Sequence, residues 1–413
     1  MRVRIHRGAA EIGGNVVEAE HDGARIILDL GLPLDAALGK ISPLPAVDGL
    51  PDGGAGLLGV ILTHAHPDHY GLIPQLGPTV PIFCGAATAS ILSEAAFFTS
   101  AGMKLTPTDF LADRKTLQLG PFQVTPILAD HSAFDAYSLV VETGGRRLFY
   151  TGDLRGHGRK GRLFEDLIAE PPGAIDVLLM EGTRIGQLDA RGFASEEEVE
   201  AEVLKTIRTA PGLVLAMFSP QNVDRLVSVY RATSRAGRTL VLDLYGASVA
   251  AATGNSAIPQ ASWDGVRVYV PQAQRVRVKS SGEFERVQEI ASERIYGEEL
   301  AAHPDRYVLL FRESMSQELA RADCLNEATA IWSMWAGYLN QPSGVRLREF
   351  LDARGVPLVI HHASGHATSA DLLRLAAAIN ADRVIPIHTA APQEFIALVD
   401  NAEIRRDGEW WDV

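Results

Sequence analysis

The sequence predicts an α/β protein with two domains, and three observations carry that prediction. A chain of 413 residues is too long for one ordinary hydrophobic core. Short strand-like runs bounded by turn residues fill much of its first half. Helix-like and strand-like segments then alternate, which is typical of a compact α/β unit. The 46% hydrophobic content and mean hydropathy of +0.05 fit a globular protein.

The strand-like runs are rich in apolar and β-branched residues between turn formers. Those in the first half are residues 24–30, 57–63, 122–128, 137–143, 146–152 and 175–181. Gly144-Gly145 separates two of them and predicts a hairpin turn. Near the C-terminus, runs 356–362 and 383–389 flank a helix-like segment at 369–381.

The clearest helix start lies at Ser195. Glu198 follows at capping-box spacing, and Val199, Val203 and Ile207 would line one helical face. We therefore expect an amphipathic helix at the start of the alternating region.

Composition narrows the classes of protein. No apolar run could cross a bilayer, and the start "MRVRIHRGAAEIGGN" has no apolar signal region, so we expect neither a membrane span nor a secretory signal. Cys84 and Cys324 stand alone, which favours a reducing cytoplasm over a disulfide framework or a zinc ribbon. Any metal would then be held by nitrogen and oxygen ligands.

The net charge of −13 argues against a general polyanion-binding surface. Two local exceptions are the basic runs "RRLFYTGDLRGHGRKGR" (146–162) and "RVRVK" (275–279). Either run alone is interpreted first as a solvated charged surface, and a local basic groove is the alternative.

The segment "LTHAHPDHYGLI" (62–73) holds His64, His66, Asp68 and His69 directly after a strand-like run. Such a cluster could be a solvated polar turn. It could also be half of a metal site, because histidine is the commonest metal ligand and zinc sites need three or four imidazoles or carboxylates.

Other candidate ligands follow other predicted strands. They are His131 in "LADHS", Asp153 in "YTGD" and His388 in "PIHT". Each alone is more simply an ordinary loop residue. Strand ends on one edge of a sheet can converge, however, so together with HxHxDH they favour a composite metal site.

This order of residues resembles the metallo-β-lactamase fold, an αββα sandwich. The resemblance implies that His64, His66 and His131 bind one metal, and that Asp68, His69 and His388 bind the other. It implies that Asp153 bridges the two. Asp29, in "LDLG", matches the family's structural aspartate, which orients the HxHxDH loop without binding metal.

The 235 positions between Asp153 and His388 exceed what the plain fold needs. The alternating α/β unit lies inside that gap and is interpreted as an insertion, as in the β-CASP nucleases. We therefore expect a metallo-β-lactamase domain over 1–190, a β-CASP domain over 191–355 and a return to the first domain over 356–413.

Three further motifs carry this resemblance. Glu181 in "LLMEGTRIG" matches motif A, His366 in "HHASGHATS" matches motif B, and His388 matches motif C. "AAEIGGN" and "HSAFDAYSLVVET" also resemble ribonuclease J and its relatives. A histidine at motif C fits RNA-acting members better than DNA-repair members.

The implied activity is phosphodiester hydrolysis of single-stranded RNA with two divalent ions, zinc first and manganese second. A bridging water would supply the nucleophile near neutral pH. His366 would stabilise the scissile phosphate, Asp68 would orient the nucleophile, and Glu181 would fix a ligand's orientation. The alternative for Glu181 is an ordinary surface or salt-bridged glutamate.

His362 and Ser364 precede the helix expected from Ser369 and match residues that hold a phosphate in ribonuclease J. Ser219 and Asn222, in "FSPQNVDRL", resemble a phosphate-binding turn, with two extra residues between them. These four residues are predicted substrate-phosphate contacts.

Two features depart from the family. Only 25 residues follow His388, which predicts that the C-terminal domain usual in ribonuclease J is missing, together with any dimerisation through it. "LLFRESMSQEL" (309–319) lacks the glycine-rich sequence of a 5′-phosphate pocket, so exonuclease and endonuclease modes both stay open.

Four alternatives stay open for function and assembly. They are a DNA nuclease of the same fold, a hydrolase of a small ester or thioester, a non-catalytic β-CASP scaffold and, for assembly, a homodimer. The seven retained ligands argue against the scaffold, and His366 with the long insertion argues against the small ester.

Overall fold

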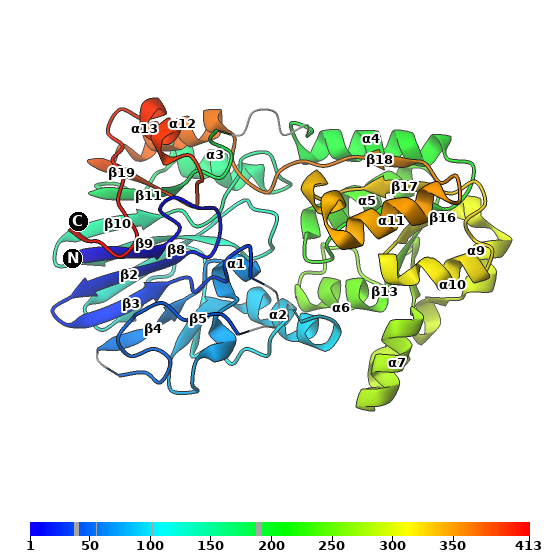
Figure 1. Cartoon of the computed structure of the whole chain (residues 1–413), viewed down its shortest axis with the longest axis horizontal. Helices are drawn as coiled ribbons and strands as arrows, with labels where there is room; N and C mark the ends of the chain where they lie inside the picture. The colour runs from blue at the N-terminus through cyan, green and yellow to red at the C-terminus, as the bar shows by residue number, and fades with distance from the viewer. Residues whose placement is uncertain (37–40, 55, 101, 187–191) are drawn as a thin grey trace. The chain divides into compact units, whose positions relative to one another are not determined.

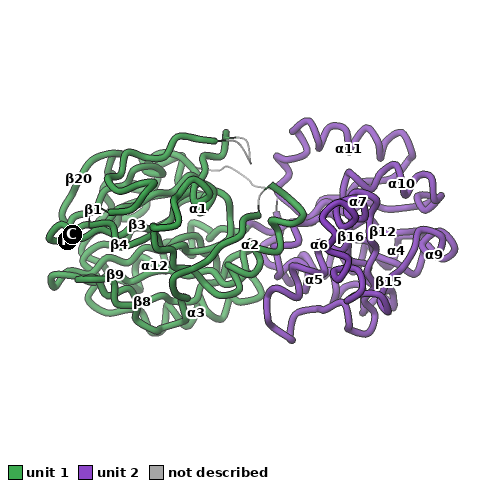
Figure 2. Tube along the Cα trace, turned by 90° about the horizontal axis from the view of Figure 1, so that it is seen from below, with its two compact units in different colours: residues 1–190, 365–413 green, residues 191–364 purple. Residues whose placement is uncertain are grey.

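A computed structural model describes residues 1–36, 41–54, 56–100, 102–186 and 192–413. The chain divides into two compact units (Figure 2). Unit 1 comprises residues 1–190 and 365–413, and unit 2 comprises residues 191–364. The chain therefore leaves unit 1, builds unit 2 and returns to unit 1 (Figure 1).

Unit 1 contains two β-sheets. The first has seven strands in the order β20-β1-β2-β3-β4-β5-β6. Their bounds, in chain order, are β1 (Arg2–Arg7), β2 (Val16–His21), β3 (Ala24–Leu28), β4 (Leu57–Ile61), β5 (Ile82–Gly85), β6 (Asp109–Leu111) and β20 (Trp410–Asp412).

The second sheet has six strands in the order β19-β11-β10-β9-β8-β7. Their bounds are β7 (Leu117–Leu119), β8 (Phe122–Leu128), β9 (Tyr137–Thr143), β10 (Arg146–Tyr150), β11 (Val177–Glu181) and β19 (Arg383–Ile387). β11 pairs in parallel with both β10 and β19, so the returning segment joins this sheet at its edge.

The two sheets pack face to face and helices cover their outer faces. Ile26 and Leu139 belong to the core between the sheets. Phe164 and Leu372 belong to a core under α3, α12 and α13, and Leu92 belongs to another under α1 and α2. The helices are α1 (Pro67–Tyr70), α2 (Ala86–Phe98), α3 (Gly161–Ala169), α12 (Ser369–Ile379) and α13 (Pro392–Leu398). Unit 1 is therefore an αββα sandwich, which confirms the predicted fold.

Strand predictions in unit 1 are correct in type. β8 and β9 have the predicted bounds, and the other strands differ at their ends. Gly144 and Gly145 both have positive φ, 57° and 70°, and form the predicted hairpin turn between β9 and β10. The runs expected to reach residues 30 and 63 stop at Leu28 and Ile61. They stop early because the chain leaves the sheet there, with Asp29 in the left-handed region at φ 59°.

Unit 2 has one seven-stranded sheet in the order β15-β14-β13-β16-β12-β17-β18. Every pairing in it is parallel. The strand bounds are β12 (Val214–Met217), β13 (Thr239–Asp243), β14 (Val266–Tyr269), β15 (Arg294–Ile295), β16 (Tyr307–Leu310), β17 (Thr329–Trp332) and β18 (Leu358–Ile360). Most residues of β12, β13, β16 and β17 are buried, as expected where helices cover both faces of a parallel sheet.

The helices of unit 2 alternate with these strands. They are α4 (Glu196–Thr209), α5 (Val223–Arg235), α6 (Leu244–Ala252), α7 (Gln272–Ser281), α8 (Glu285–Gln288), α9 (Gly297–Ala302), α10 (Ser316–Arg321) and α11 (Pro342–Asp352). The predicted start of α4 is correct, because the hydroxyl oxygen of Ser195 accepts from the Glu198 backbone N–H at 3.2 Å.

The second boundary of the insertion differs from the sequence-based one. The first, at residues 190 and 191, lies outside the described residues. The second moves from 355 to 364, because β18 pairs in parallel with β17 and places Ile360 opposite Trp332. Residues 356–364 therefore belong to unit 2 and not to the returning segment.

A buried ion pair stabilises unit 2. Arg225 and Glu196 are both fully buried, and the guanidinium donates to the two carboxylate oxygens at 2.8 and 3.1 Å. Arg225→Met leaves the Glu196 carboxylate buried without its cation, so we expect a loss of about 3–5 kcal/mol in the free energy of unfolding. Urea denaturation measures it. Lys205→Met is the control, because Lys205 pairs with Glu202 at the surface of α4 and its loss should cost under about 1 kcal/mol. Equal losses would contradict this account.

Candidate metal centre

The HxHxDH segment leaves β4 and turns into the short helix α1. His66 is the N-cap of α1 and Pro67 is its first residue, a position that tolerates proline because its missing N–H would be unpaired there. Asp68 and His69 lie within the helix, and His64 lies between strand and helix. This tight turn brings four candidate ligands together from six consecutive positions.

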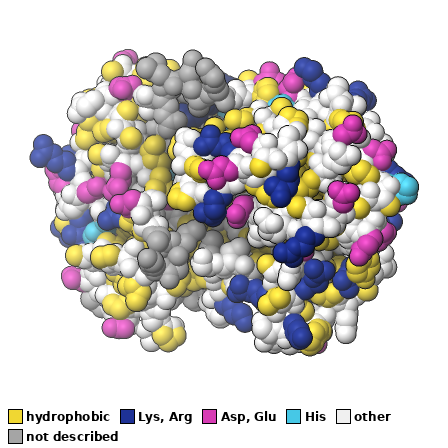
Figure 3. Space-filling model, turned by 45° about the vertical axis from the view of Figure 1, so that its right-hand side comes forward, with side chains coloured by type: hydrophobic (Ala, Val, Ile, Leu, Met, Phe, Trp, Pro, Cys, Tyr) yellow, Lys and Arg dark blue, Asp and Glu magenta, His cyan; other side chains and the backbone are white. Residues whose placement is uncertain are grey.

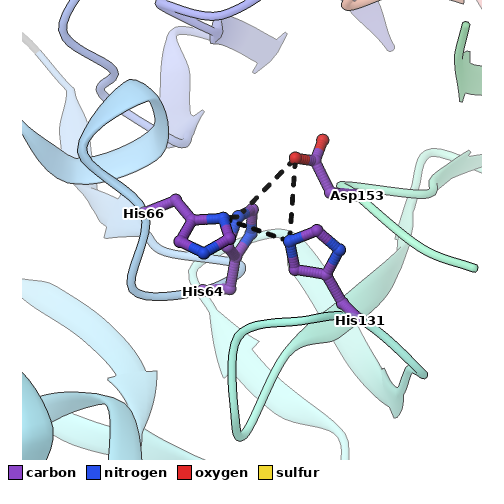
Figure 4. A group of neighbouring side chains, drawn as sticks. All are labelled: His64, His66, His131 and Asp153. Atoms are coloured by element: carbon purple, nitrogen blue, oxygen red, sulfur yellow. Dashed lines mark hydrogen bonds and ion pairs between the residues drawn. The ribbon is translucent and has the colours of Figure 1, made fainter. Parts of the chain in front are cut away.

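Two of these side chains and two from other strand ends form a first group. His64, His66, His131 and Asp153 offer ligand atoms that all lie within 4.8 Å of one another, and they point inward (Figure 4). His66 Nδ1 lies 3.2 Å from His64 Nε2 and 3.1 Å from His131 Nε2. The Asp153 Oδ2 atom lies 3.7 Å from His64 Nε2.

A second group shares Asp153. Asp68, His69, Asp153 and His388 again offer atoms within 4.8 Å of one another. His69 Nε2 lies 3.2 Å from Asp153 Oδ2, and His388 Nδ1 lies 3.6 Å from Asp153 Oδ1. His388 Nε2 lies 3.7 Å from Asp68 Oδ2. The structure thus brings all seven predicted ligands to one place, with Asp153 common to both groups.

The chemistry of these donors fits divalent cations. His131 Nδ1 lies 2.7 Å from the Gly365 carbonyl oxygen and must donate to it, so the lone pair of Nε2 faces His66. Two facing ring nitrogens at such distances repel unless a proton or cation lies between them. The buried atoms His69 Nε2, both Asp153 oxygens and both His388 nitrogens also have no hydrogen-bond partner among the described residues. Buried nitrogen and oxygen atoms that have no hydrogen-bond partner fit a metal site, where they would bind the cation.

Burial and nearby carboxylates shift the pKa values of the histidines in opposite directions. Burial holds the pKa of His64 and of His131 well below the usual value and lowers that of His66 to about 4. Burial also acts downward on His69, but the carboxylates of Asp153 and Asp29 outweigh it and raise its pKa. Neutral imidazoles are the form in which histidine binds metal.

Asp29 lies behind the HxHxDH loop. Its carboxylate accepts from the Thr63 N–H at 2.8 Å, from the Tyr150 hydroxyl at 2.8 Å and from His69 Nδ1 at 2.8 Å. With Nδ1 engaged, Nε2 of His69 is directed at Asp153. This geometry supports the orienting role predicted for Asp29.

We expect Asp29→Asn to weaken metal binding by roughly 10–100-fold, the usual cost of losing a partner that orients a ligand. The neutral amide cannot accept all three hydrogen bonds. Competition with a chromophoric chelator measures the affinity, and Asp166→Asn, at a half-exposed surface pair, is the matched control. An unchanged affinity would remove Asp29 from the site.

Glu181 and His366 form a third group with Asp153. His366 Nδ1 lies 3.0 Å from Glu181 Oε2 and 3.7 Å from Asp153 Oδ2. Burial acts against protonation of His366, but Glu181 and Asp153 outweigh it and raise its pKa to about 9. Glu181 also accepts from the Leu154 N–H at 2.9 Å. Glu181 thus contacts His366 and the residue after Asp153, and its role in fixing the orientation of a metal ligand stays a prediction.

Three supporting residues escaped the sequence analysis. Tyr150 and Thr63 bind Asp29, and Gly31 approaches Asp68 so closely that a Cβ there would lie 1.8 Å from the Asp68 carbonyl oxygen. The glycine of "LDLG" was the available signal for Gly31, since close backbone approach requires glycine. Hydroxyl partners at positions 63 and 150 have no such signal.

The four predicted phosphate contacts lie in unit 2. Asn222 caps α5 by accepting from the Arg225 N–H at 3.0 Å, and the Ser219 carbonyl accepts from the Asn222 N–H. The His362 carbonyl accepts from the Phe193 N–H. The helix expected after Ser364 begins at Ser369, and its N-cap is Thr368. Their contact with phosphate stays a prediction.

Comparison with known proteins supports the metal centre. A family model described as a β-lactamase superfamily domain matches residues 33–213. A crystal structure of a protein of unknown function from Enterococcus faecalis V583 superposes with a TM-score of 0.79 at 22% identity, covering 99% of each chain, which shows a shared fold.

Curated relatives carry the name ribonuclease J. That of Mycobacterium tuberculosis H37Rv is 25% identical over 97% of this chain and 74% of its own length. That of Sinorhizobium meliloti is 29% identical over 48% of this chain and 36% of its own. A ribonuclease J-like protein of Methanocaldococcus jannaschii is 24% identical over 59% of this chain and 57% of its own.

Two further observations bear on the class of protein. Within the described residues, no helix has the length and apolar character needed to cross a membrane. Cys84 and Cys324 are free and buried.

The family match supports the predicted metal-dependent hydrolase. The chain is thus similar to the β-lactamase superfamily over residues 33–213 and to curated ribonuclease J proteins.

Proposed function

We propose that this protein is a metal-dependent phosphodiesterase that cleaves single-stranded RNA. The observation that carries the proposal is the position of His366. Its ring centroid lies 5.5 Å from that of His131 and 5.6 Å from that of His388, so it adjoins both metal-ligand groups. It belongs to neither four-residue group. A hydrogen-bond donor beside such a centre suits a phosphate whose negative charge increases during attack. The ribonuclease J relatives support RNA as the polymer.

His64, His66 and His131 would hold one divalent ion, and Asp68, His69 and His388 the other, with Asp153 shared. Zinc is our first candidate and manganese the second. Such ions, when bound, lower the pKa of a water and neutralise phosphate oxygens.

The protein's own groups supply the remaining chemistry. His366 donates a hydrogen bond to a non-bridging oxygen of the scissile phosphate. Glu181 fixes the imidazole through Nδ1, so Nε2 on the other edge of the ring is presented to substrate. Asp68, whose side chain is 17% exposed, orients the attacking water and accepts its proton. His362, Ser364, Ser219 and Asn222 are proposed to contact phosphates farther along the strand.

A substrate panel tests this function. The metal-loaded protein is offered 5′-monophosphate, 5′-triphosphate and circular single-stranded RNA, single-stranded DNA, and a small thioester. We expect cleavage of RNA in preference to DNA, with the thioester left intact. Cleavage of circular RNA would establish an endonuclease mode. Hydrolysis of the thioester with RNA untouched would overturn the proposal.

A further inference from the structure

The carboxyl edge of the unit 2 sheet gathers polar and aromatic residues. Because all its strands are parallel, the segments that follow them emerge on one edge. Tyr245 follows β13, α7 follows β14, Arg312 follows β16 and Trp335 follows β17. The carboxyl edge is where open α/β sheets bind ligands.

Trp335 and Tyr338 form an exposed aromatic pair at this edge. They are 57% and 46% exposed, and their ring centroids lie 5.3 Å apart in a T-shaped arrangement. A Cβ on Gly337 would lie 2.2 Å from the Trp335 ring, so the glycine makes room for the indole. The Trp332 indole N–H donates to the Trp335 carbonyl at 3.2 Å. The loop therefore holds a large ring in a defined position while leaving much of it in solvent.

The basic run at 275–279 lies on helix α7. Arg275, Arg277 and Lys279 are exposed, and the helix contains no acidic residue. Val278 is its one buried side chain. In Figure 1, α7 lies at the lower end of unit 2. In the space-filling view of Figure 3, Lys and Arg side chains gather on the lower part of the visible face. In a chain of net charge −13, this helix is a local cationic surface.

A chain of contacts links α7 to the middle of the edge. Gln274 on α7 donates to Asp243 Oδ2 at 2.7 Å, and Asp243 pairs with Arg312 at 2.5 Å. The Arg312 guanidinium lies 4.9 Å from the centre of the Tyr245 ring, and Tyr245 accepts from Gln221 at 3.0 Å. β14 and β17 are separated by four strand spacings, or about 19 Å at the usual spacing.

We propose that this carboxyl edge binds single-stranded RNA, with a base stacking on Trp335 and Tyr338 and backbone phosphates lying against the cations of α7. The inference rests on the proposed RNA cleavage. A ring platform and a basic surface on one edge fit a flexible polyanion that carries flat bases. A protein partner would instead favour a contiguous apolar patch, and here the aromatic pair and α7 are joined by polar side chains.

Single-turnover cleavage of oligouridylate at rising concentrations of metal-loaded protein gives a half-saturating concentration and a maximal rate. Trp335→Ala should raise the half-saturating concentration about 5- to 150-fold, the usual effect of removing a stacking ring, at an unchanged maximal rate. Trp335→Phe should restore most of the affinity. The double variant Arg277→Gln with Lys279→Gln should also raise the half-saturating concentration. It should reduce the slope of log affinity against log salt by about 1.4, or about 0.7 per phosphate contact.

Phe110→Ala and Lys205→Gln are matched controls, since Phe110 is 53% exposed in unit 1 and Lys205 is 73% exposed on α4. Both should leave RNA binding unchanged. Unchanged half-saturation in the Trp335→Ala and α7 variants would overturn the proposal and leave a protein as occupant of the edge. Equal defects in Trp335→Ala and Trp335→Phe would exclude stacking.

A binding measurement separates this inference from the proposed function. Fluorescence anisotropy follows labelled oligouridylate with the full chain in chelator, where cleavage is not needed. If the metal-loaded protein leaves RNA intact while binding still depends on Trp335 and α7, RNA binding at the carboxyl edge is supported and the proposed function is wrong. If RNA is cleaved and the variants bind as the wild type does, only the edge assignment fails.

Discussion

Asp153→Asn is expected to lose metal from both ligand groups and to reduce RNA cleavage to background. Asp153 is the only residue of the described chain that belongs to all three groups of converging ligand atoms. Its Oδ1 faces His388 and its Oδ2 faces His64 and His69. An amide removes the negative charge that both cations would share. The activity loss should therefore exceed the roughly 10–100-fold typical of residues that only orient ligands.

Elemental analysis and single-turnover cleavage, performed on the same preparation, measure the two effects. Asp135→Asn is the control, because Asp135 is a partly buried carboxylate in unit 1 that binds the Thr88 N–H and the Tyr137 hydroxyl instead. That variant should keep its metal. Full metal content in Asp153→Asn would show that the aspartate is not a shared ligand.

His366→Ala is expected to keep the bound metal and to lower single-turnover cleavage by about 10²–10³-fold, the cost of removing one donor to a charge that develops in the transition state. The metal should stay because the two groups of four are complete without His366. Glu181→Gln should give a smaller loss, because it keeps His366 but weakens the interaction that fixes Nδ1.

The comparison is made at matched metal content, with His21→Ala as a control for replacing a histidine on β2, outside the site. If cleavage by His366→Ala stays within about threefold of wild type, as for an ordinary surface substitution, His366 has no part in the reaction. If the variant loses metal, His366 is a ligand and the division of roles proposed here is wrong.

The convergence of the candidate metal ligands was predictable from the sequence because these residues are chemically distinctive and follow strands. His131, Asp153 and His388 each stand just after a strand end, and parallel or antiparallel pairing within one sheet brings such ends together. The αββα fold was implied by the family resemblance that this motif order carries. Against that family's plain fold, the spacing between Asp153 and His388 also indicated an insertion.

What the sequence did not predict depends on tertiary packing. The partners of Asp29 come from positions 34, 40 and 121 residues away, and a hydroxyl at Tyr150 looks like any strand residue until the sheets meet. The second boundary was misplaced because the short run at β18 pairs within the unit 2 sheet, and pairing partners are a property of the fold. Glu181 was placed near the site, but its contact with His366 required the packed structure.

Titration of the metal-free protein with zinc or manganese, with bound metal and RNA cleavage measured at each point, tests the central claim most directly. This account predicts that cleavage of single-stranded RNA is absent without metal, rises with loading and reaches its plateau when two ions are bound per chain. Full cleavage in excess chelator, or protein that retains only traces of metal after zinc and manganese are supplied, would contradict it.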